Sequence, residues 1–202
     1  MNPLEIEVKF FVADLKPIRD RLLEFGAQSR GRFFETNVRF EDSEKNLIKK
    51  NALLRLRKDN RVTLTYKSKP GVGDENFKIY HELEVEVNDF KTMESILNSM
   101  GFCAVQVYEK WRETLVLNNT QLCLDTMPFG NFLEIEGSRE NIMAMAKRLS
   151  LDWEKRILFN YLKMFEMIKT QEKLNFSDVT FENFKQISLN ISNYISDFYV
   201  KA

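Results

Sequence analysis

The sequence predicts an α+β fold in which one large antiparallel sheet carries helices on its outer side. The first observation is that apolar and charged residues alternate with a period of two in several segments, which is typical of strands with two different faces. The second is that a strand followed by a capped helix occurs twice, with a weaker third copy. Repeated strand and helix units of this kind favour a sheet with its helices packed outside.

The charged face of each alternating segment carries mostly one sign. Acidic rows run through residues 5–7, 82–86 and 134–136, and basic rows run through 55–57, 67–69 and 110–112. Alternation alone also fits half-buried strands whose charged face is solvated. A solvated face does not require charges of one sign on each strand. We therefore expect the rows to surround a shared space when the strands form one sheet.

The residue types in these rows indicate the chemistry of that space. Clustered carboxylates repel one another unless a cation lies between them, and their oxygens are the ligands that Mg²⁺ or Mn²⁺ prefers. Clustered Arg and Lys suit a compact polyanion, and Arg favours forked contacts to phosphate oxygens. A metal–phosphate substrate would satisfy both sets of charges.

The two main strand–helix units share a spacing. Asp14 is the expected N-cap of the first helix and Gly26 ends it, while Asp89 and Gly101 bound the second helix with the same separation. The third copy is the strand at 134–136 followed by a helix over about 138–149. The pairs Asp59-Asn60 and Asn118-Asn119 predict hairpin turns. Internal duplication explains the matched spacing better than chance resemblance between amphipathic elements.

Composition excludes several classes of protein. The 202 residues include 30 Lys and Arg and 30 Asp and Glu, so the net charge is zero and no broad nucleic-acid surface is expected. No apolar run approaches the roughly 20 residues that span a bilayer, so no membrane partner is expected. Charged residues at the N-terminus argue against a signal peptide. With only Cys103 and Cys123, a reduced cytoplasmic location is the expectation.

The C-terminal part of the chain has a different composition. Residues 169–202 lack charge-striped strands, and the apolar residues from Phe184 to Phe198 fit a helical stripe. We therefore divide the chain into a main domain, residues 1–168, and a C-terminal helical extension, residues 169–202. The extension is expected to pack on the main domain or to form a homodimer contact.

Several common catalytic motifs are missing from the sequence. There is no Gly-rich phosphate loop and no dinucleotide-binding fingerprint. His81 is the single histidine, which makes a Ser-His-Asp triad improbable, and two separated cysteines do not fit the usual zinc spacings. Nucleophilic catalysis by a side chain is therefore not expected.

Seven ordered segments resemble the CYTH superfamily, also called triphosphate tunnel metalloenzymes, and most resemble its class IV adenylyl cyclase-like group. Glu5-Ile6-Glu7-Val8-Lys9 is similar to the ExExK signature of this family. The similarity continues to about residue 166 through Leu54-Arg55-Leu56-Arg57, Thr63-Leu64-Thr65-Tyr66-Lys67, Glu82-Leu83-Glu84-Val85-Glu86-Val87, Glu109-Lys110-Trp111-Arg112, Asp125 with Gly130-Asn131-Phe132-Leu133-Glu134-Ile135-Glu136-Gly137, and the closing segment Asn160-Tyr161-Leu162-Lys163-Met164-Phe165.

The resemblance implies a closed eight-stranded antiparallel β-barrel that forms a tunnel for a triphosphate group and Mg²⁺ or Mn²⁺. It implies a catalytic or substrate-binding role for Lys9. It implies phosphate contacts from Arg55, Arg57, Lys67, Lys110 and Arg112, and metal ligation by Glu5, Glu7, Glu82, Glu84, Asp125, Glu134 and Glu136.

Arg39 marks a departure from the family pattern. Many members carry a Tyr in the strand after the first helix, within a pattern like DTYFD, where this chain reads Asn37-Val38-Arg39-Phe40-Glu41. Mechanisms that pair this Tyr with the lysine of ExExK are therefore not expected to apply here. Arg39 can instead add a phosphate contact.

The resemblance implies an enzyme that acts on a small triphosphate-containing molecule. The residues leave two reactions open, namely hydrolysis of the triphosphate and cyclisation of ATP by a class IV adenylyl cyclase mechanism. A non-catalytic polyphosphate- or nucleotide-binding module is the alternative. The acidic rows argue against that alternative, because anion binding requires only Arg and Lys.

Overall fold

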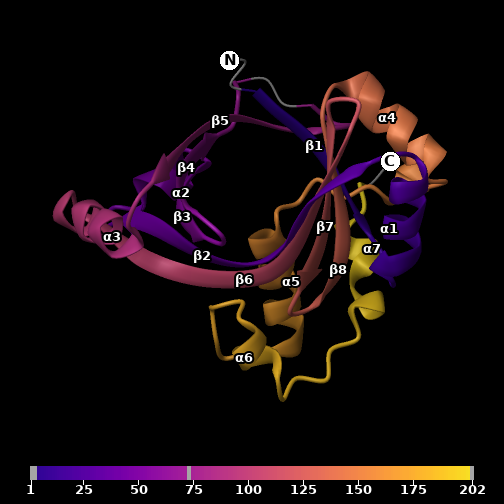
Figure 1. Cartoon of the computed structure of the whole chain (residues 1–202). Coiled ribbons are helices and arrows are strands. Elements are labelled where there is room, and N and C mark those ends of the chain that lie inside the picture. Colours follow the sequence, from indigo (N-terminus) through magenta and orange to yellow (C-terminus); the bar gives the residue numbers. More distant parts are fainter. Residues whose placement is uncertain (1–3, 72–73, 201–202) are drawn as a thin grey trace.

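The computed structural model describes residues 4–71 and 74–200. Eight strands form one antiparallel sheet that closes on itself in a ring (Figure 1), as the sequence predicted. The order around the ring is β1, β5, β4, β3, β2, β6, β7 and β8, and β8 pairs with β1. The strands are β1 Leu4–Phe11, β2 Gln28–Asp42, β3 Ala52–Lys58, β4 Val62–Ser68, β5 Lys78–Val87, β6 Phe102–Leu117, β7 Thr120–Met127 and β8 Gly130–Glu136.

The predicted turns and helix caps are present. Asn118 and Asn119 both have positive φ, 48° and 59°, as the tight turn between β6 and β7 requires. The side chains of Asp14 and Asp89 accept backbone N–H bonds at the starts of α1 and α3. The helices are α1 Leu15–Glu24, α2 Asn46–Lys49, α3 Phe90–Ser99, α4 Arg139–Arg148, α5 Tyr161–Glu172, α6 Phe181–Phe184 and α7 Ile195–Phe198, with short 3₁₀ turns η1 Trp153–Lys155 and η2 Ile191–Asn193.

The apolar faces of the strands point outward, and helices cover much of this surface, although Leu83 and Val85 of β5 are exposed. Val8 of β1 packs against Leu22 of α1 and Ile142 of α4 in one core cluster. On the far side of the ring, Phe40 of β2 packs in a second cluster that includes Leu97 of α3. Burying a side chain of this size stabilises the fold by about 1.5–3 kcal/mol. This arrangement leaves the charged faces directed into the ring.

A third core cluster joins the C-terminal residues to the ring. It includes Phe132 of β8, Phe165 of α5, Phe184 of α6 and Phe198 of α7. The sequence-based boundary at residue 168 falls inside α5, so residues on both sides of it share one core. The extension thus packs on the ring, which is one of the two arrangements expected for it.

The continuous helix expected between Phe184 and Phe198 is not formed. Two short turns, η2 and α7, replace it, although Ile191 and Ile195 are buried as the apolar pattern implied. Asn190 Oδ1 accepts a hydrogen bond from the Ser192 backbone N–H at 3.1 Å. Asn and Ser side chains that bond the local backbone compete with helix formation, and this explains the interruption.

The extension also bonds to β6 beyond the part of that strand that pairs with β7. The backbone N–H of Val179 donates to the carbonyl of Val107 at 2.8 Å, and the N–H of Glu109 donates to the carbonyl of Val179 at 2.9 Å. Ile157 forms a similar bridge to Lys9 of β1 and to Tyr199. Residues far apart in sequence are therefore fixed to the two strands that carry Lys9 and Lys110.

None of the helices within residues 4–71 and 74–200 is long and apolar enough to cross a membrane.

Candidate active site inside the strand ring

The inward faces of the strands surround a cavity of about 1620 Å³. Every site residue predicted from the sequence contributes to its wall except Asp125, which is fully buried behind the wall. The predicted residues that line the cavity are Glu5, Glu7, Lys9, Arg39, Arg55, Arg57, Lys67, Glu82, Glu84, Lys110, Arg112, Glu134 and Glu136.

The strand order separates the two signs of charge. The acidic rows lie on β8, β1 and β5, which are neighbours in the ring. The basic rows lie on β4, β3 and β6, and β2, which lies between β3 and β6, adds Arg39 as well as the acidic Glu35. In a ring of eight strands, this order places β1 opposite β2, β5 opposite β6 and β8 opposite β3. The cavity therefore has an acidic wall, formed by β8, β1 and β5, that faces a basic wall, formed by β4, β3, β2 and β6.

Lysine side chains lie among the carboxylates of the acidic wall. Lys67 Nζ is 2.5 Å from Glu5 Oε2 and 3.2 Å from Glu82 Oε2, while Lys78 Nζ donates to Glu7. Burial, followed by repulsion from Glu7, nevertheless raises the pKa of Glu5 to about 7. Burial also opposes ionisation of Glu7, but Lys78 and the other nearby lysines outweigh it and lower the pKa of Glu7 to about 2.

Glu134 and Glu136 on β8 lie in different electrostatic surroundings. The Lys9 ammonium group donates to Glu134. Burial disfavours the charged form of Glu134, yet Lys9 and Arg112 hold its pKa well below the usual range. Glu136 accepts a hydrogen bond from Gln121 Nε2 at 2.8 Å. Burial and the charge of Glu7 raise the pKa of Glu136.

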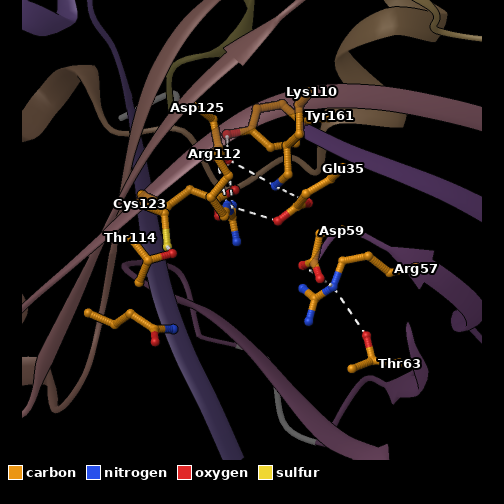
Figure 2. Close-up of polar contacts among 12 residues, drawn as sticks. Glu35, Arg57, Asp59, Thr63, Lys110, Arg112, Thr114, Cys123, Asp125 and Tyr161 are labelled. Carbon is orange, nitrogen blue, oxygen red and sulfur yellow. Dashed lines mark hydrogen bonds and ion pairs between the residues drawn. The ribbon is translucent and has the colours of Figure 1, made fainter. Parts of the chain in front are cut away.

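Short polar contacts orient the arginines of β3. Arg55 donates from Nη1 to the Tyr108 hydroxyl at 3.3 Å and from Nη2 to Thr65 Oγ1 at 3.1 Å. Arg57 Nε donates to Thr63 Oγ1 at 3.2 Å, and Asp59 lies 3.5 Å from the same nitrogen (Figure 2). Both guanidinium groups lie on the cavity wall, where Glu84 is also near them, 3.3 Å from Arg57 Nη2 and 3.7 Å from Arg55 Nη2. Phosphate oxygens could form forked contacts to the arginines in place of Glu84.

Asp125 joins the two cations of β6. Its Oδ1 accepts from Arg112 Nε at 2.6 Å, and its Oδ2 accepts from Lys110 Nζ at 3.0 Å (Figure 2). The Tyr161 hydroxyl donates to the same Oδ2 at 2.7 Å. On the cavity side, Glu35 Oε2 is 3.6 Å from Lys110 Nζ. Burial opposes ionisation of Glu35, but Lys110 and Arg112 outweigh it and lower its pKa to about 2.

The donor chemistry of the acidic wall fits a hard divalent cation. The raised pKa values of Glu5 and Glu136 indicate negative charge that the nearby lysines do not fully offset. Carboxylate oxygens are suitable ligands for Mg²⁺ or Mn²⁺. Within the described residues, however, no three Asp, Glu, His or Cys side chains are already gathered in a metal-binding arrangement. Lys67 lies between the Oε2 atoms of Glu5 and Glu82, so these two oxygens can converge on a metal only if Lys67 moves.

Four residues of the site were not identified from the sequence. Lys78 shares a strand face with Glu82, and Glu35 shares one with Arg39, so extending the two-residue alternation would have found both. Asp59 lies at the β3–β4 turn, and its pairing with Arg57 depends on the turn geometry. Tyr161 begins α5 and lies in the closing segment of the resemblance, but its contact with Asp125 depends on tertiary packing.

Comparisons with known proteins agree with this geometry. Residues 3–157 match the family model of the CYTH domain. The PH1012 protein from Pyrococcus horikoshii OT3 is 30% identical, with a TM-score of 0.67 over 79% of this chain and 98% of that one. A Vibrio parahaemolyticus protein described as a candidate adenylate cyclase is 17% identical, with a TM-score of 0.73 over 82% of this chain and 99% of that one.

A third similar structure is HpAC1 from Hippeastrum, a candidate adenylyl cyclase described as having a dominant triphosphatase activity. It is 17% identical, with a TM-score of 0.55 over 81% of this chain and 95% of that one. No curated protein matches the chain in sequence.

Proposed function

Because this chain belongs to the CYTH domain family, we propose that its cavity binds the triphosphate group of a small molecule and promotes metal-dependent hydrolysis of that group. The observation that carries this proposal is the pair of opposed walls. The basic wall matches a chain of phosphates, and the acidic wall matches the divalent cation that accompanies such a chain in water.

The cations of the basic wall would bind the phosphate oxygens and hold the triphosphate in line for attack. Arg55, Arg57, Lys110 and Arg112 lie on adjacent or nearby strands and are already oriented by hydrogen bonds. Pre-oriented charges lower the barrier because they need little reorganisation when negative charge develops on the phosphoryl group. Arg39 would add a contact from β2.

Lys9 would act from β1, the middle strand of the acidic wall. It is almost fully buried on β1, and its ammonium group donates to Glu134 while lying 3.9 Å from Glu7. A buried ammonium in this position can bind a phosphate oxygen and stabilise its charge as a water molecule attacks the terminal phosphorus.

Mg²⁺ or Mn²⁺ is part of the proposal. Glu5, Glu7, Glu134 and Glu136 would hold it, with Glu82 or Glu84 completing the set. A bound divalent ion neutralises phosphate charge and lowers the pKa of water. Asp125 has a different role, because it is fully buried behind the cavity wall and its oxygens bond Tyr161, Lys110 and Arg112. We assign Asp125 to positioning those two cations.

Cyclisation of a nucleoside triphosphate is the second candidate. In this reaction the ribose 3′-hydroxyl attacks the α-phosphorus and pyrophosphate leaves. The cavity of about 1620 Å³ is larger than the roughly 300–1,000 Å³ typical of small-molecule sites. Its wall includes Phe33 and Phe159, which are about one-third exposed and can contact a nucleobase. The cavity therefore has space and apolar surface for more than a triphosphate.

A product assay tests the proposal and separates the candidates. The purified chain is incubated with Mg²⁺ or Mn²⁺ and with tripolyphosphate, ATP or thiamine triphosphate, and phosphate, pyrophosphate and cyclic AMP are measured. Phosphate release from tripolyphosphate supports hydrolysis, whereas cyclic AMP and pyrophosphate from ATP support cyclisation. Tight binding without turnover would contradict both reactions and leave a binding module.

A cytoplasmic location and a homodimer stay predictions from the sequence.

A further inference from the structure

We propose that Tyr161 is a positioning residue that holds Lys9, Lys110 and, through Asp125, Arg112 on the cavity wall. This inference rests on the proposed function of the cavity, because the three cations matter as triphosphate contacts. Tyr161 belongs to the closing segment of the family resemblance, which begins just after residues 3–157, the part of the chain that matches the family model.

The aromatic ring of Tyr161 faces two ammonium groups. Lys9 Nζ is 4.3 Å from the ring centroid, and Lys110 Nζ is 5.2 Å from it. Both distances fall within the range of attraction between a cation and the face of an aromatic ring, and this attraction is stronger where water is excluded. Lys9 and Lys110 are both nearly fully buried. The ring therefore contacts both amines, each of which also has a carboxylate partner, Glu134 for Lys9 and Asp125 for Lys110.

The hydroxyl of Tyr161 fixes the carboxylate that orients β6. It donates to Asp125 Oδ2 at 2.7 Å, while Arg112 Nε donates to Asp125 Oδ1 at 2.6 Å. Figure 2 shows the hydroxyl directed at Asp125, with Lys110 beside the ring. Because Asp125 is fully buried, rotation of its carboxylate would leave polar atoms without partners. Removing the hydroxyl would therefore loosen Asp125 and the two cations bonded to it.

Packing and capping hold Tyr161 in place. The side chain of Asn160 caps α5 by accepting from the Lys163 backbone N–H at 2.7 Å, which fixes the helix start at Tyr161. The Tyr161 ring also packs edge-on against Phe132 with centroids 5.3 Å apart. A residue held by its helix, by β8 and by Asp125 is suited to positioning others. Its hydroxyl is used by Asp125, so it is not assigned to the reacting atoms.

Two substitutions separate the contributions of the hydroxyl and the ring. Tyr161→Phe removes the hydroxyl and keeps the ring, so we expect the turnover number with Mg²⁺ and tripolyphosphate to fall about tenfold while KM changes less than twofold. Tyr161→Leu also removes the ring, so we expect a further loss of turnover and a KM at least fivefold higher. Phe165→Leu is the control, because Phe165 is a buried ring on the same helix that belongs to the aromatic core.

A measurement of Lys9 tests the positioning without relying on turnover. The ring current of Tyr161 should shift the Lys9 Cε protons upfield in NMR spectra of lysine-labelled protein. The shift should persist in Tyr161→Phe and in Phe165→Leu, and it should disappear in Tyr161→Leu. If the wild type neither binds nor hydrolyses tripolyphosphate, the proposed function fails. The Lys9 chemical shift still tests the contact between the Tyr161 ring and Lys9 in that case.

Either of two results would overturn the inference. One is a Lys9 signal that is not shifted upfield in the wild type, and the other is a turnover number of Tyr161→Phe equal to that of the wild type. If Tyr161→Leu does not fold, the Tyr161→Phe kinetics and the wild-type Lys9 signal still decide the matter. A Phe165→Leu variant with losses as large as those of both Tyr161 variants would also overturn it, because general loosening of α5 would then explain the effect.

Discussion

Lys67 Nζ lies 2.5 Å from Glu5 Oε2 and 3.2 Å from Glu82 Oε2, so a lysine of the basic wall reaches between two carboxylates of the acidic wall. The same nitrogen cannot bind these oxygens and leave them free for a metal ion. Binding of a divalent cation by these two oxygens therefore requires Lys67 to move, and the phosphates of the substrate are the partners we expect it to turn toward. In the proposed function, metal and triphosphate would each make binding of the other more favourable.

Metal affinity should depend on pH through Glu5. Burial and repulsion from Glu7 raise the pKa of Glu5 to about 7, and a carboxyl group must lose its proton to ligate a metal. Since the ionised fraction of such a group rises about tenfold between pH 6 and pH 8, Mn²⁺ affinity should rise by a similar factor. Isothermal titration at the two pH values measures it. Glu5→Gln should flatten the profile, and a flat wild-type profile would argue against Glu5 as a ligand.

Glu5 should also affect stability in the absence of metal. Its pKa in the folded protein is above the value of 4.5 for an exposed glutamate, so the folded state binds the proton more tightly than the unfolded state. The contribution of Glu5 to the free energy of unfolding is thus present below pH 4.5 and is lost as the pH rises through about 7. Glu5→Gln should stabilise the metal-free protein more at pH 8 than at pH 5, as measured by urea unfolding. An equal effect at both pH values would disagree with the raised pKa.

Glu136→Gln should abolish metal-dependent turnover and leave the protein folded. The substitution keeps the size of a side chain that lines the cavity but removes a carboxylate expected to hold metal. Phosphate release and circular dichroism measure the two effects. Glu24→Gln is the matched control, because Glu24 is an exposed glutamate on α1, outside the ring. Undiminished turnover by Glu136→Gln would refute the assignment of Glu136.

Arg57→Met should weaken tripolyphosphate binding about 10- to 100-fold. A hydrogen bond to a charged group contributes about 1.5–3 kcal/mol, and methionine retains much of the apolar stem while removing the guanidinium. Titration calorimetry with tripolyphosphate and Mg²⁺ measures the change. Arg148→Met provides the comparison, because Arg148 is exposed on α4 outside the ring. Equal affinities of Arg57→Met and the wild type would remove Arg57 from the phosphate site.

Phe198→Ala should destabilise the whole protein. Phe198 is 1% exposed and shares its core with α5 and β8, so its truncation should cost about 3–5 kcal/mol. Chemical unfolding should show one transition at lower denaturant. Met143→Ala, at a half-exposed position on α4, should change stability little. A separate early transition of the C-terminal residues would show instead that the extension unfolds independently of the ring.

Much of the fold was predictable because local patterns determine it. A two-residue alternation assigns each strand residue to one face or the other, and this placed Glu5, Arg55 and Glu134 on the inward side. Asp14 and Asp89 were recognisable as caps because the capping hydrogen bond is local. The ring closure came from the resemblance of ordered segments, since strand pairing between β1 and β8 joins residues more than a hundred positions apart.

The remaining features depend on tertiary contacts. The sequence did not show that Asp125 would be buried behind Lys110 and Arg112, because alternation gives the face of a residue and not the depth of its side chain. It also did not show the Tyr161–Asp125 contact between α5 and β7. The apolar residues after Phe184 correctly indicated burial, but burial alone does not require a helix.

The most direct test of the opposed walls is a crystal structure of the chain with Mn²⁺ and a non-hydrolysable tripolyphosphate analogue. We expect an anomalous scattering peak beside Glu5, Glu7 and Glu136, and phosphate density against Arg55, Arg57 and Arg112. Lys67 should then contact phosphate rather than Glu5. A triphosphate bound outside the cavity, or a cavity that contains neither metal nor phosphate at saturating concentrations of both, would contradict the proposed function.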